Sequence, residues 1–229
     1  MKHETVINVY SQNVAPRLFD EFMEYYLNLT EESTQKAFSE FFDMLHLKNG
    51  YKVLEVGFWT GRNLAFYPDH IHLKGIDITP KMIEIAKGKA DELKRNNAEY
   101  AVFDGHNIPF DDNQFDVVLE TFALCGAEKP QKLLDEMVRV CTPEGLVGLF
   151  DYRRANEGSR IRKEQDVLAE TVKRQGICYK GHVVAVFDMQ LELDKRVKES
   201  VEKYNLRIID QLTTENSLID CLGRYVLQK

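Results

Sequence analysis

The sequence predicts an α/β fold: a doubly wound, mostly parallel sheet of seven strands with an antiparallel C-terminal edge and a helical N-terminal cap. Strand and helix patterns alternate between residues 51 and 151, which is typical of a parallel sheet covered by helices on both faces. Residues 1–50 show helical periodicity, and two strand patterns close the chain. Because no linker interrupts the 229 residues, we expect a single domain: a cap over 1–50, a core over 51–151, and an insert with C-terminal strands over 152–229.

The cap is predicted to contain two helices between Val14 and His46, because large apolar residues recur there at three- and four-residue spacings. Thr30, followed by Glu31 and Glu32, marks the start of the second helix, since acidic side chains stabilise the positive end of the helix dipole. The apolar positions of the two helices are Leu18, Phe19, Phe22, Tyr25, Tyr26, Leu29, Phe38, Phe41, Phe42 and Leu45.

The core is predicted to contain five strands with helices between them. In the helix that follows the second strand, Thr79 is expected to accept a free N–H as the N-cap and Pro80 to take the first helical position. A further helix, Pro130–Val140, is expected to stop at Thr142–Gly145. The predicted strands are Val53–Val56, Leu73–Ile78, Tyr100–Phe103, Phe115–Glu120 and Leu146–Phe150.

The tail is predicted to form helices near Ile161–Gln175 and Leu191–Tyr204, and antiparallel strands at Leu206–Leu212 and Gly223–Gln228. Its first part, residues 153–163, is locally basic. Two interpretations stay open: a solvated helix start, or a cluster that attracts a phosphate-bearing or acidic acceptor. The basic residues, set against Glu157 alone, are Arg153, Arg154, Arg160, Arg162 and Lys163.

The chain carries 37 acidic and 30 basic residues, a net charge of −7, which argues against a general nucleic-acid binder. No apolar run approaches the roughly 18 residues of a membrane span, and Met1–Glu4 lacks the apolar core of a signal peptide. The four Cys residues form no Cys-x-x-Cys pair, so we expect reduced thiols and no metal site. These features predict a cytoplasmic protein with at most peripheral membrane contact.

Acidic and glycine residues stand where the predicted strands end. Ligands of an open α/β sheet bind outside the carboxyl ends of its strands, at the point where the strand order reverses. A turn between Gly57 and Gly61 lets a ligand approach the backbone, and Asp77, about 20 residues further on, is placed to accept ribose hydroxyls. The turn lacks the close glycine pair of a nicotinamide-dinucleotide site, and Asp104 suits an adenine amine better than a phosphate.

Four motifs in order resemble those of class I S-adenosylmethionine-dependent methyltransferases. Residues 53–64 resemble the glycine loop, 75–82 the ribose motif, 104–111 the adenine motif, and 115–118 with 139–145 the later strand and helix-end motifs. The likeness is greatest to the ubiquinone/menaquinone and phosphatidylethanolamine N-methyltransferase group. It implies a Rossmann-like fold, S-adenosyl-L-methionine as cofactor, and methyl transfer by in-line displacement to a small-molecule or lipid-like acceptor.

The resemblance also implies which residues bind the cofactor. Asp77 is expected on the ribose and Asp104 on the adenine amine, while Glu55 lies beneath the methionine end. His106 either stacks on adenine or is a solvated loop residue, and Arg62 either contacts the cofactor carboxylate or caps the following helix. The full expected set is Tyr10, Glu55, Gly57, Trp59, Gly61, Asp77, Ile78, Met82, Asp104, Gly105, His106 and Thr121.

No general base is identified, although Tyr10, Asp151 and Tyr152 are candidates by position. The sulfonium of the cofactor is already a good leaving group, so the protein mainly has to align the nucleophile with the methyl group and exclude water. Cys125 is therefore interpreted as buried packing rather than as a nucleophile.

Trp59 departs from the family pattern, because it stands where the middle glycine of acid-x-Gly-x-Gly-x-Gly is expected. A bulky residue at positive φ costs about 1–2 kcal/mol, and its ring is placed to cover the methionine pocket. This departure leaves an alternative open: a catalytically silent binding protein of the same fold, with Trp59 altering the cofactor loop.

Overall fold

A computed structural model gives the arrangement of the chain. Tyr10 and most of the first predicted cap helix lie outside the residues that it describes. The structure describes residues Leu18, Glu21, Glu24, 32–95, 97–175, 177–179, 182–185, 191–215 and 221–229.

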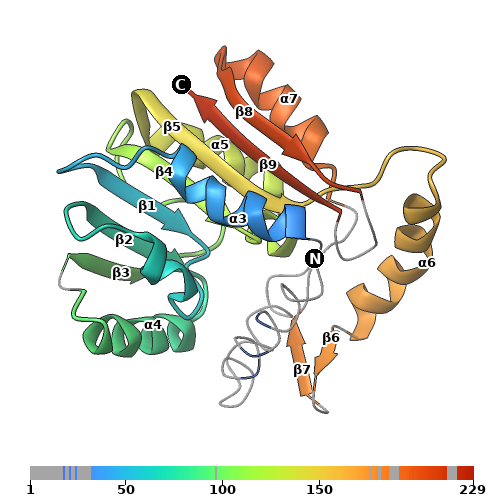
Figure 1. Ribbon diagram of the computed structural model, residues 1–229, viewed down its shortest axis with the longest axis horizontal. Helices are drawn as coiled ribbons and strands as arrows, with labels where there is room; N and C mark the ends of the chain where they lie inside the picture. Colours follow the sequence, from blue (N-terminus) through green and yellow to red (C-terminus); the bar gives the residue numbers. More distant parts are fainter. Residues whose placement is uncertain are drawn as a thin grey trace.

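The core is a seven-stranded sheet in the order β3-β2-β1-β4-β5-β9-β8 (Figure 1). The first five strands along the chain are parallel, while β9 runs antiparallel to β5 and β8 antiparallel to β9. This confirms the predicted mostly parallel sheet with an antiparallel C-terminal edge. The strands are β1 (Lys52–Val56), β2 (His72–Asp77), β3 (Ala98–Val102), β4 (Phe115–Thr121), β5 (Cys141–Tyr152), β8 (Arg207–Thr213) and β9 (Leu222–Gln228).

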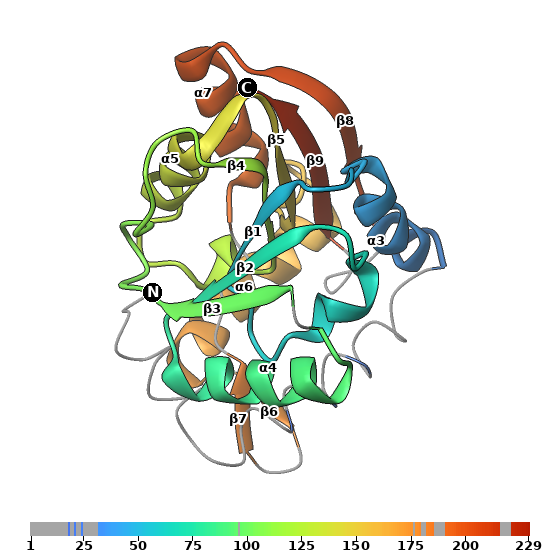
Figure 2. The same cartoon turned by 90° about the vertical axis from the view of Figure 1, so that its left-hand side faces the viewer.

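Helices cover both faces of this sheet, as Figure 2 shows from the side. The α3 helix packs on β5 and β9, whereas α4 packs on β2 and β3, and α5 on β4 and β5. Beyond the carboxyl ends of the parallel strands lie α6 and a β6–β7 hairpin (Figure 1). The bounds are α3 (Glu32–Met44), α4 (Pro80–Glu92), α5 (Pro130–Val140), α6 (Arg160–Gln175), α7 (Leu193–Tyr204), β6 (Ile177–Tyr179), β7 (His182–Ala185) and the 3-10 helices η1 (Arg62–Phe66) and η2 (Leu124–Gly126).

Apolar residues on both faces place β1 and β4 at the centre of the sheet. Val53, Leu54 and Val56 of β1 are fully buried, and β4 is buried from Val117 onward. Such a continuous apolar strand is what a sheet covered on both faces requires. The chain passes from β1 outward to β3 and then returns to β4, so the strand order reverses between β1 and β4. The carboxyl ends of these two strands therefore define the expected ligand position.

Two local expectations need correction, and one hairpin was not expected. The Pro130–Val140 helix ends where it was expected to, but β5 begins at Cys141 and not at Leu146, because it takes up Thr142–Gly145 as a bulge against β4. The Thr79 hydroxyl forms no capping hydrogen bond, although Pro80 does take the first helical turn. The β6–β7 hairpin was not predicted, since strands of three and four residues carry too little periodicity to recognise.

Candidate functional site

A pocket opens at the carboxyl ends of β1, β2 and β4, at the point where the strand order reverses. Its empty space amounts to about 510 Å³, part of which is open solvent outside the pocket. Its wall is mostly apolar, with two carboxylates. The residues that line it are Val56, Gly57, Trp59, Asp77, Ile78, Thr79, Phe103, Gly105, Ala123, Gly126, Ala127, Glu128 and Leu133.

Gly57 brings the loop after β1 into direct contact with the loop after β4. Its φ of 73° lies in the left-handed region, and a Cβ at this position would stand only 2.5 Å from the Cβ of Ala123. Its N–H donates to the carbonyl of Ile76 at 2.8 Å, which ties the loop to β2. A side chain here would therefore separate the two loops that form the pocket wall.

Trp59 adopts the strained conformation expected from its position in the glycine loop. Its φ is 53°, a left-handed value that costs a bulky residue about 1–2 kcal/mol. The backbone N–H of Trp59 donates to Oδ2 of Asp77 at 3.1 Å, and the partly buried indole lines the pocket. The strain is thus offset by a hydrogen bond to a charged group and by packing, both of which shape the pocket.

Asp77 ends β2, and its carboxylate binds the backbone of both the glycine loop and the segment that leads into α4. Its Oδ2 accepts the N–H of Trp59, and its Oδ1 accepts the N–H of Thr79 at 2.8 Å. Burial raises the pKa of Asp77 to about 6, even though these hydrogen bonds lower it. At neutral pH the site therefore presents an anchored carboxylate at the pocket wall.

Glu55 lies behind the glycine loop rather than in the pocket wall. Its carboxyl accepts hydrogen bonds from Nδ2 of Asn63 at 2.6 Å and from the hydroxyl of Tyr67 at 2.7 Å. The same Asn63 amide donates to Oγ1 of Thr121 at 2.9 Å, which links β1 to β4 through η1. Burial raises the pKa of Glu55 to about 8, so this carboxyl is largely protonated at neutral pH. Sequence reasoning gave Asn63 and Tyr67 no role of their own; both stand within the motif region that carried the resemblance.

The loop after β3 supplies the opposite wall of the pocket. Gly105 lines the pocket. Oδ1 of Asp104 accepts the N–H groups of His106 (2.7 Å) and Asn107 (2.6 Å), and its Oδ2 accepts a hydrogen bond from Nδ2 of Asn107 (2.6 Å). Slight burial acts in the opposite direction, but these hydrogen bonds lower the pKa of Asp104 to about 2. The imidazole of His106 lies 3.6 Å from Glu128, which is itself part of the wall. Asp104 therefore shapes this loop with both of its oxygens.

Arg139 of α5 fastens the same loop to the domain. Its guanidinium donates to the carbonyls of Ile108 and Phe110, each at 2.9 Å, and pairs with Asp112 and Glu136 at 2.7 Å. One side chain thus satisfies two loop carbonyls and two carboxylates. The position of the loop after β3 consequently depends on α5.

Two buried carboxyl groups support the loop after β4. Oε2 of Glu120 accepts the N–H groups of Ala123 (2.8 Å) and Leu124 (3.4 Å), and Oδ2 of Asp151 accepts that of Cys125 (2.9 Å). Both residues are 0% exposed. Sequence reasoning missed Glu120, which reads as the end of an apolar strand. The available signal was an acid at the end of such a strand, as at Glu55 and Asp77.

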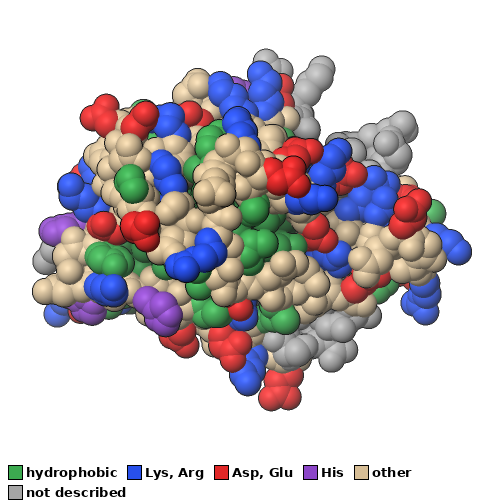
Figure 3. All heavy atoms as spheres, turned by 90° about the horizontal axis from the view of Figure 1, so that it is seen from above, with side chains coloured by type: hydrophobic (Ala, Val, Ile, Leu, Met, Phe, Trp, Pro, Cys, Tyr) green, Lys and Arg blue, Asp and Glu red, His purple; other side chains and the backbone are tan. Residues whose placement is uncertain are grey.

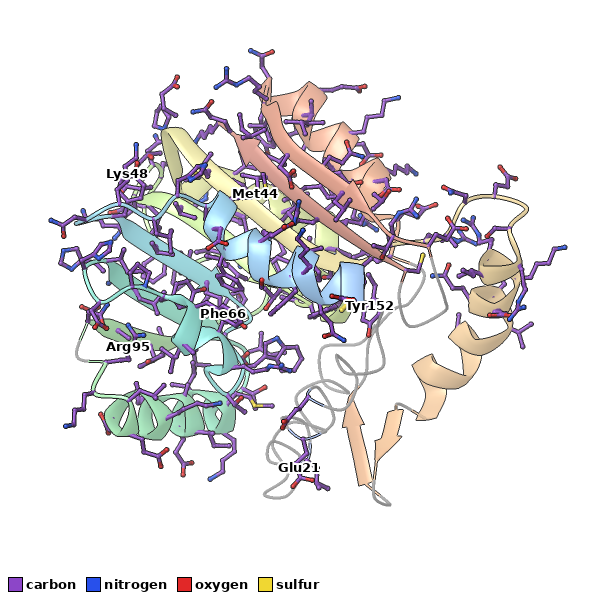
Figure 4. All side chains as sticks on the ribbon, in the orientation of Figure 1. Glu21, Met44, Lys48, Phe66, Arg95 and Tyr152 are labelled. Carbon is purple, nitrogen blue, oxygen red and sulfur yellow. The ribbon has the colours of Figure 1, made fainter. Side chains whose placement is uncertain are left out.

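Aromatic side chains gather on the α3 face next to the same loop. Phe122 has a positive φ of 58°. The centroid of its ring lies 6.5 Å from that of Phe38 and 5.3 Å from that of Tyr152. Phe66 stands 5.8 Å from Phe38 and remains 42% exposed. Figure 4 shows that Phe66 and Tyr152 come from the ends of different elements on this side of the sheet. A largely buried aromatic cluster therefore supports the loop that carries Ala123, through its neighbour Phe122.

Only some of the expected cofactor residues line the pocket. Asp104 and His106 stand on the loop beside the pocket, while Asp151 and Tyr152, the described candidate bases, are both buried and do not line it. Tyr10 lies outside the described residues. Of the rest, the pocket wall contains Gly57, Trp59, Asp77, Ile78 and Gly105, whereas Glu55, Gly61, Met82 and Thr121 lie behind it.

Acidic neighbours neutralise most of the basic cluster after β5. Arg153 is buried and pairs with Asp194 at 2.7 Å, and Arg154 pairs with Asp166 at 3.2 Å. Arg160 pairs with its helical neighbour Glu164. Figure 3 shows the same interspersion of basic and acidic side chains across one face of the molecule. These pairs favour a role of the cluster in folding the insert over an anion site.

None of the helices that the structure describes is both long and apolar enough to cross a membrane. Within the same described ranges, no three His, Cys, Asp or Glu side chains gather as a metal site would require.

Residues 54–149 match the family model of a methyltransferase domain. Among curated proteins, the chain is similar to the thiol S-methyltransferase TMT1B of Rattus norvegicus, with 30% identity over 148 residues, 64% of this chain and 61% of that protein. It is also similar to the phosphatidylethanolamine N-methyltransferase of Cereibacter sphaeroides, with 31% identity over 110 residues, 48% of this chain and 54% of that protein. The chain thus spans less than two thirds of the length of these relatives.

The fold is shared with solved structures. A SAM-dependent methyltransferase from Aquifex aeolicus superposes with a TM-score of 0.57 at 20% identity, covering 93% of this chain and 97% of that one. At this identity the likeness establishes the fold, and it confirms the predicted Rossmann-like architecture.

Proposed function

We propose that this protein is an S-adenosylmethionine-dependent methyltransferase that transfers a methyl group to a small-molecule or lipid-like acceptor, since residues 54–149 match the methyltransferase domain model. The observation that carries the proposal is the clamp at Asp77. A buried carboxylate, held by the N–H groups of Trp59 and Thr79, faces the pocket where the strand order reverses.

The chemistry of the residues that line the pocket supports S-adenosyl-L-methionine as the cofactor. Gly57 leaves bare backbone where a side chain has no room, so a ligand can approach the loop closely. Asp77 offers acceptor oxygens for ribose hydroxyls. Ile78, Phe103 and Leu133 line the wall with apolar surface that suits a purine ring.

Bound S-adenosylmethionine supplies an electrophilic methyl group on a sulfonium that leaves as a neutral thioether. The residues of this chain then contribute by holding and orienting the reactants. Asp77 and the backbone of the glycine loop fix the nucleoside end, while the apolar side chains of the pocket wall exclude water from it. Alignment and exclusion of water account for acceleration without a covalent intermediate.

The acceptor class draws support from two further points. The relatives are named for a thiol and for phosphatidylethanolamine, which are small or lipid-like acceptors. Phe66, whose ring contacts that of Phe38, stays 42% exposed and gives the α3 face an apolar side chain. We therefore propose an apolar acceptor that carries a soft or amine nucleophile.

Isothermal titration with S-adenosylmethionine and S-adenosylhomocysteine tests the cofactor part of the proposal. We expect both to bind wild type, Asp77→Ala to lose most of the affinity, and the exposed α4 control Asp91→Ala to retain it. Methyl transfer is then measured with an alkyl thiol and with phosphatidylethanolamine vesicles. Binding without transfer to any acceptor supports the silent alternative, and absence of binding by wild type contradicts both the enzyme and the cofactor assignment.

A further inference from the structure

Glu120 and Asp151 form a pair of carboxyl groups inside the protein. Both side chains are 0% exposed, at the carboxyl ends of the neighbouring parallel strands β4 and β5. Glu120 stands opposite Leu149, so Asp151, two residues further, lies on the same face of the sheet. Two ionised carboxylates in such a position repel each other strongly, which favours a state with one proton between them.

The hydrogen bonds around the pair show where this proton resides. Both oxygens of Asp151 accept backbone N–H groups, from Cys125 at 2.9 Å and from Tyr152 at 2.6 Å. Oε2 of Glu120 accepts the N–H groups of Ala123 and Leu124, whereas its Oε1 is buried and has no other donor. Oε1 is therefore the Glu120 oxygen that accepts no N–H group and is left to carry this proton.

The same hydrogen bonds hold one wall of the cofactor pocket. The pair accepts three successive N–H groups, those of Ala123, Leu124 and Cys125. Ala123 and Gly126 of this segment line the pocket, and Ala123 packs against Gly57. The segment begins at Phe122, whose positive φ needs the surrounding contacts to persist.

We propose that Glu120 and Asp151 share one proton and act as positioning residues that hold the 122–126 loop against the cofactor pocket, so that cofactor affinity falls when the pair loses this proton. The inference rests on the proposed function for its effect on the cofactor, while the shared proton itself is testable without any ligand.

In the part of the sheet that the structure describes, the outer neighbours of the two carboxyl groups carry no charge. From β1, Val56 stands opposite Glu120, and from β9, Gly223 stands opposite Asp151. The α5 helix contributes buried apolar side chains, including Leu133 and Leu134. The titratable groups that face the pair are the Cys125 thiol, which hydrogen-bonds Asp151, and the adjacent Tyr152.

The pKa values have the corresponding directions. Burial and the charge of Asp151 raise the pKa of Glu120 well above its usual range, and burial also raises the pKa of Asp151. Their mutual hydrogen bond raises the pKa of Glu120 and lowers that of Asp151, in agreement with the hydrogen bonds that leave Oε1 of Glu120 without an N–H donor.

The first experiment follows the amide resonances of Ala123, Leu124 and Cys125 by NMR between pH 6 and 10 without cofactor. In wild type we expect the three to titrate together as Glu120 ionises. In Glu120→Gln, the side-chain amide can donate a hydrogen bond to Asp151 and accept one from the N–H of Ala123, as protonated Glu120 does. Because this amide does not ionise, the pH transition of the three resonances should disappear. Glu92→Gln, on an exposed position of α4, is the control that keeps the wild-type transition.

The second experiment measures S-adenosylmethionine affinity over the same pH range. We expect wild-type affinity to fall by up to about tenfold per pH unit above the transition. Glu120→Gln should bind like wild type at pH 7 and keep its affinity at high pH. Asp151→Asn should bind more weakly at every pH, because its single oxygen cannot accept both the Cys125 and the Tyr152 N–H.

Three results would overturn the inference. The first is that the three amides of wild type fail to titrate together, and the second is that the amides of Glu120→Gln titrate as those of wild type do. The third is that the cofactor affinities of wild type and Glu120→Gln depend on pH in the same way. Absence of cofactor binding by wild type would contradict the proposed function, while coupled amide titration would still support the shared proton and the held loop. Should Glu120→Gln not fold, the wild-type titration decides, and loss of any common transition overturns the inference.

Discussion

The backbone N–H of Trp59 donates a hydrogen bond to Oδ2 of Asp77 over 3.1 Å, and so joins the glycine loop after β1 to the end of β2. The donor is a backbone group, which means that the bond does not depend on the indole. The residue that departs from the expected glycine therefore keeps the loop in its working position, while its ring adds a wall to the pocket.

Trp59 is the single tryptophan of the chain, so its fluorescence should report occupancy of the pocket. We expect saturable quenching when S-adenosylmethionine is added, because the ligand and the indole share one wall. Trp59→Phe should lose the signal but retain binding by calorimetry, since the backbone N–H to Asp77 remains. Unchanged emission at a cofactor concentration that saturates calorimetric binding would place the ligand elsewhere.

Cofactor affinity should fall on the acidic side of pH 6. Burial raises the pKa of Asp77 to about 6, and only the ionised carboxylate offers all of its acceptor positions to ribose hydroxyls. We expect a loss of up to about tenfold per pH unit below that value. Calorimetry between pH 5 and 8 checks this, with Asp77→Asn as a weaker but nearly pH-independent comparison. Equal wild-type affinity at pH 5 and 7.5 would contradict the assignment of Asp77.

The free energy of unfolding should depend on pH through the ionisation of Glu55. Burial raises the folded-state pKa of Glu55 from 4.5 to about 8, so the folded state prefers the protonated form. This preference stabilises the folded state fully when the pH is below the pKa of Glu55 in the unfolded chain, and the stabilisation is lost as the pH rises toward 8. Over that range the free energy of unfolding falls by up to about 1.4 kcal/mol per pH unit. In denaturant unfolding at pH 5 to 9, Glu55→Gln should lack this slope and gain stability relative to wild type as the pH rises. The exposed control Glu92→Gln should follow wild type, and parallel curves for Glu55→Gln would refute the prediction.

Replacing Arg139 by Ala should destabilise the domain by about 1–3 kcal/mol. The substitution leaves the carbonyls of Ile108 and Phe110 and the carboxylate of Glu136 without their shared donor. The cofactor should also bind more weakly, since the loop that carries Gly105 loses its tie to α5. Arg160→Ala, which removes an exposed pair within α6, is the matched control and should leave the melting temperature unchanged. Equal melting temperatures for the two variants would disprove the anchoring role.

The sequence predicted Asp77 and Gly57 because their signals are local. A short apolar strand, a glycine turn and an acid about 20 residues further on encode a ribose site within one strand–helix–strand unit. The structure places both residues in the pocket wall. Asp104 carries the same kind of strand-end signal, yet its oxygens bind its own loop, because a short turn satisfies them first.

The pairing of Glu120 with Asp151 had no such local signal. The two residues are 31 positions apart, and their approach depends on the register of β4 against β5, which the bulge after Cys141 sets. The same holds for Arg139, whose partners lie on a loop some 30 residues away. Side-chain partners across elements follow from register and packing, and neither is written in periodicity.

By itself, the sequence determined the class of the fold, the succession of strands and helices, and the acids and glycines at the strand ends. These features follow from periodicity and from turn chemistry, which act over a few residues. The tertiary structure alone decided which of those acids faces the pocket, which lies behind it and which shares its surroundings with another carboxyl. That outcome depends on burial and on the hydrogen-bond donors that distant segments bring to each carboxyl once the sheet has formed.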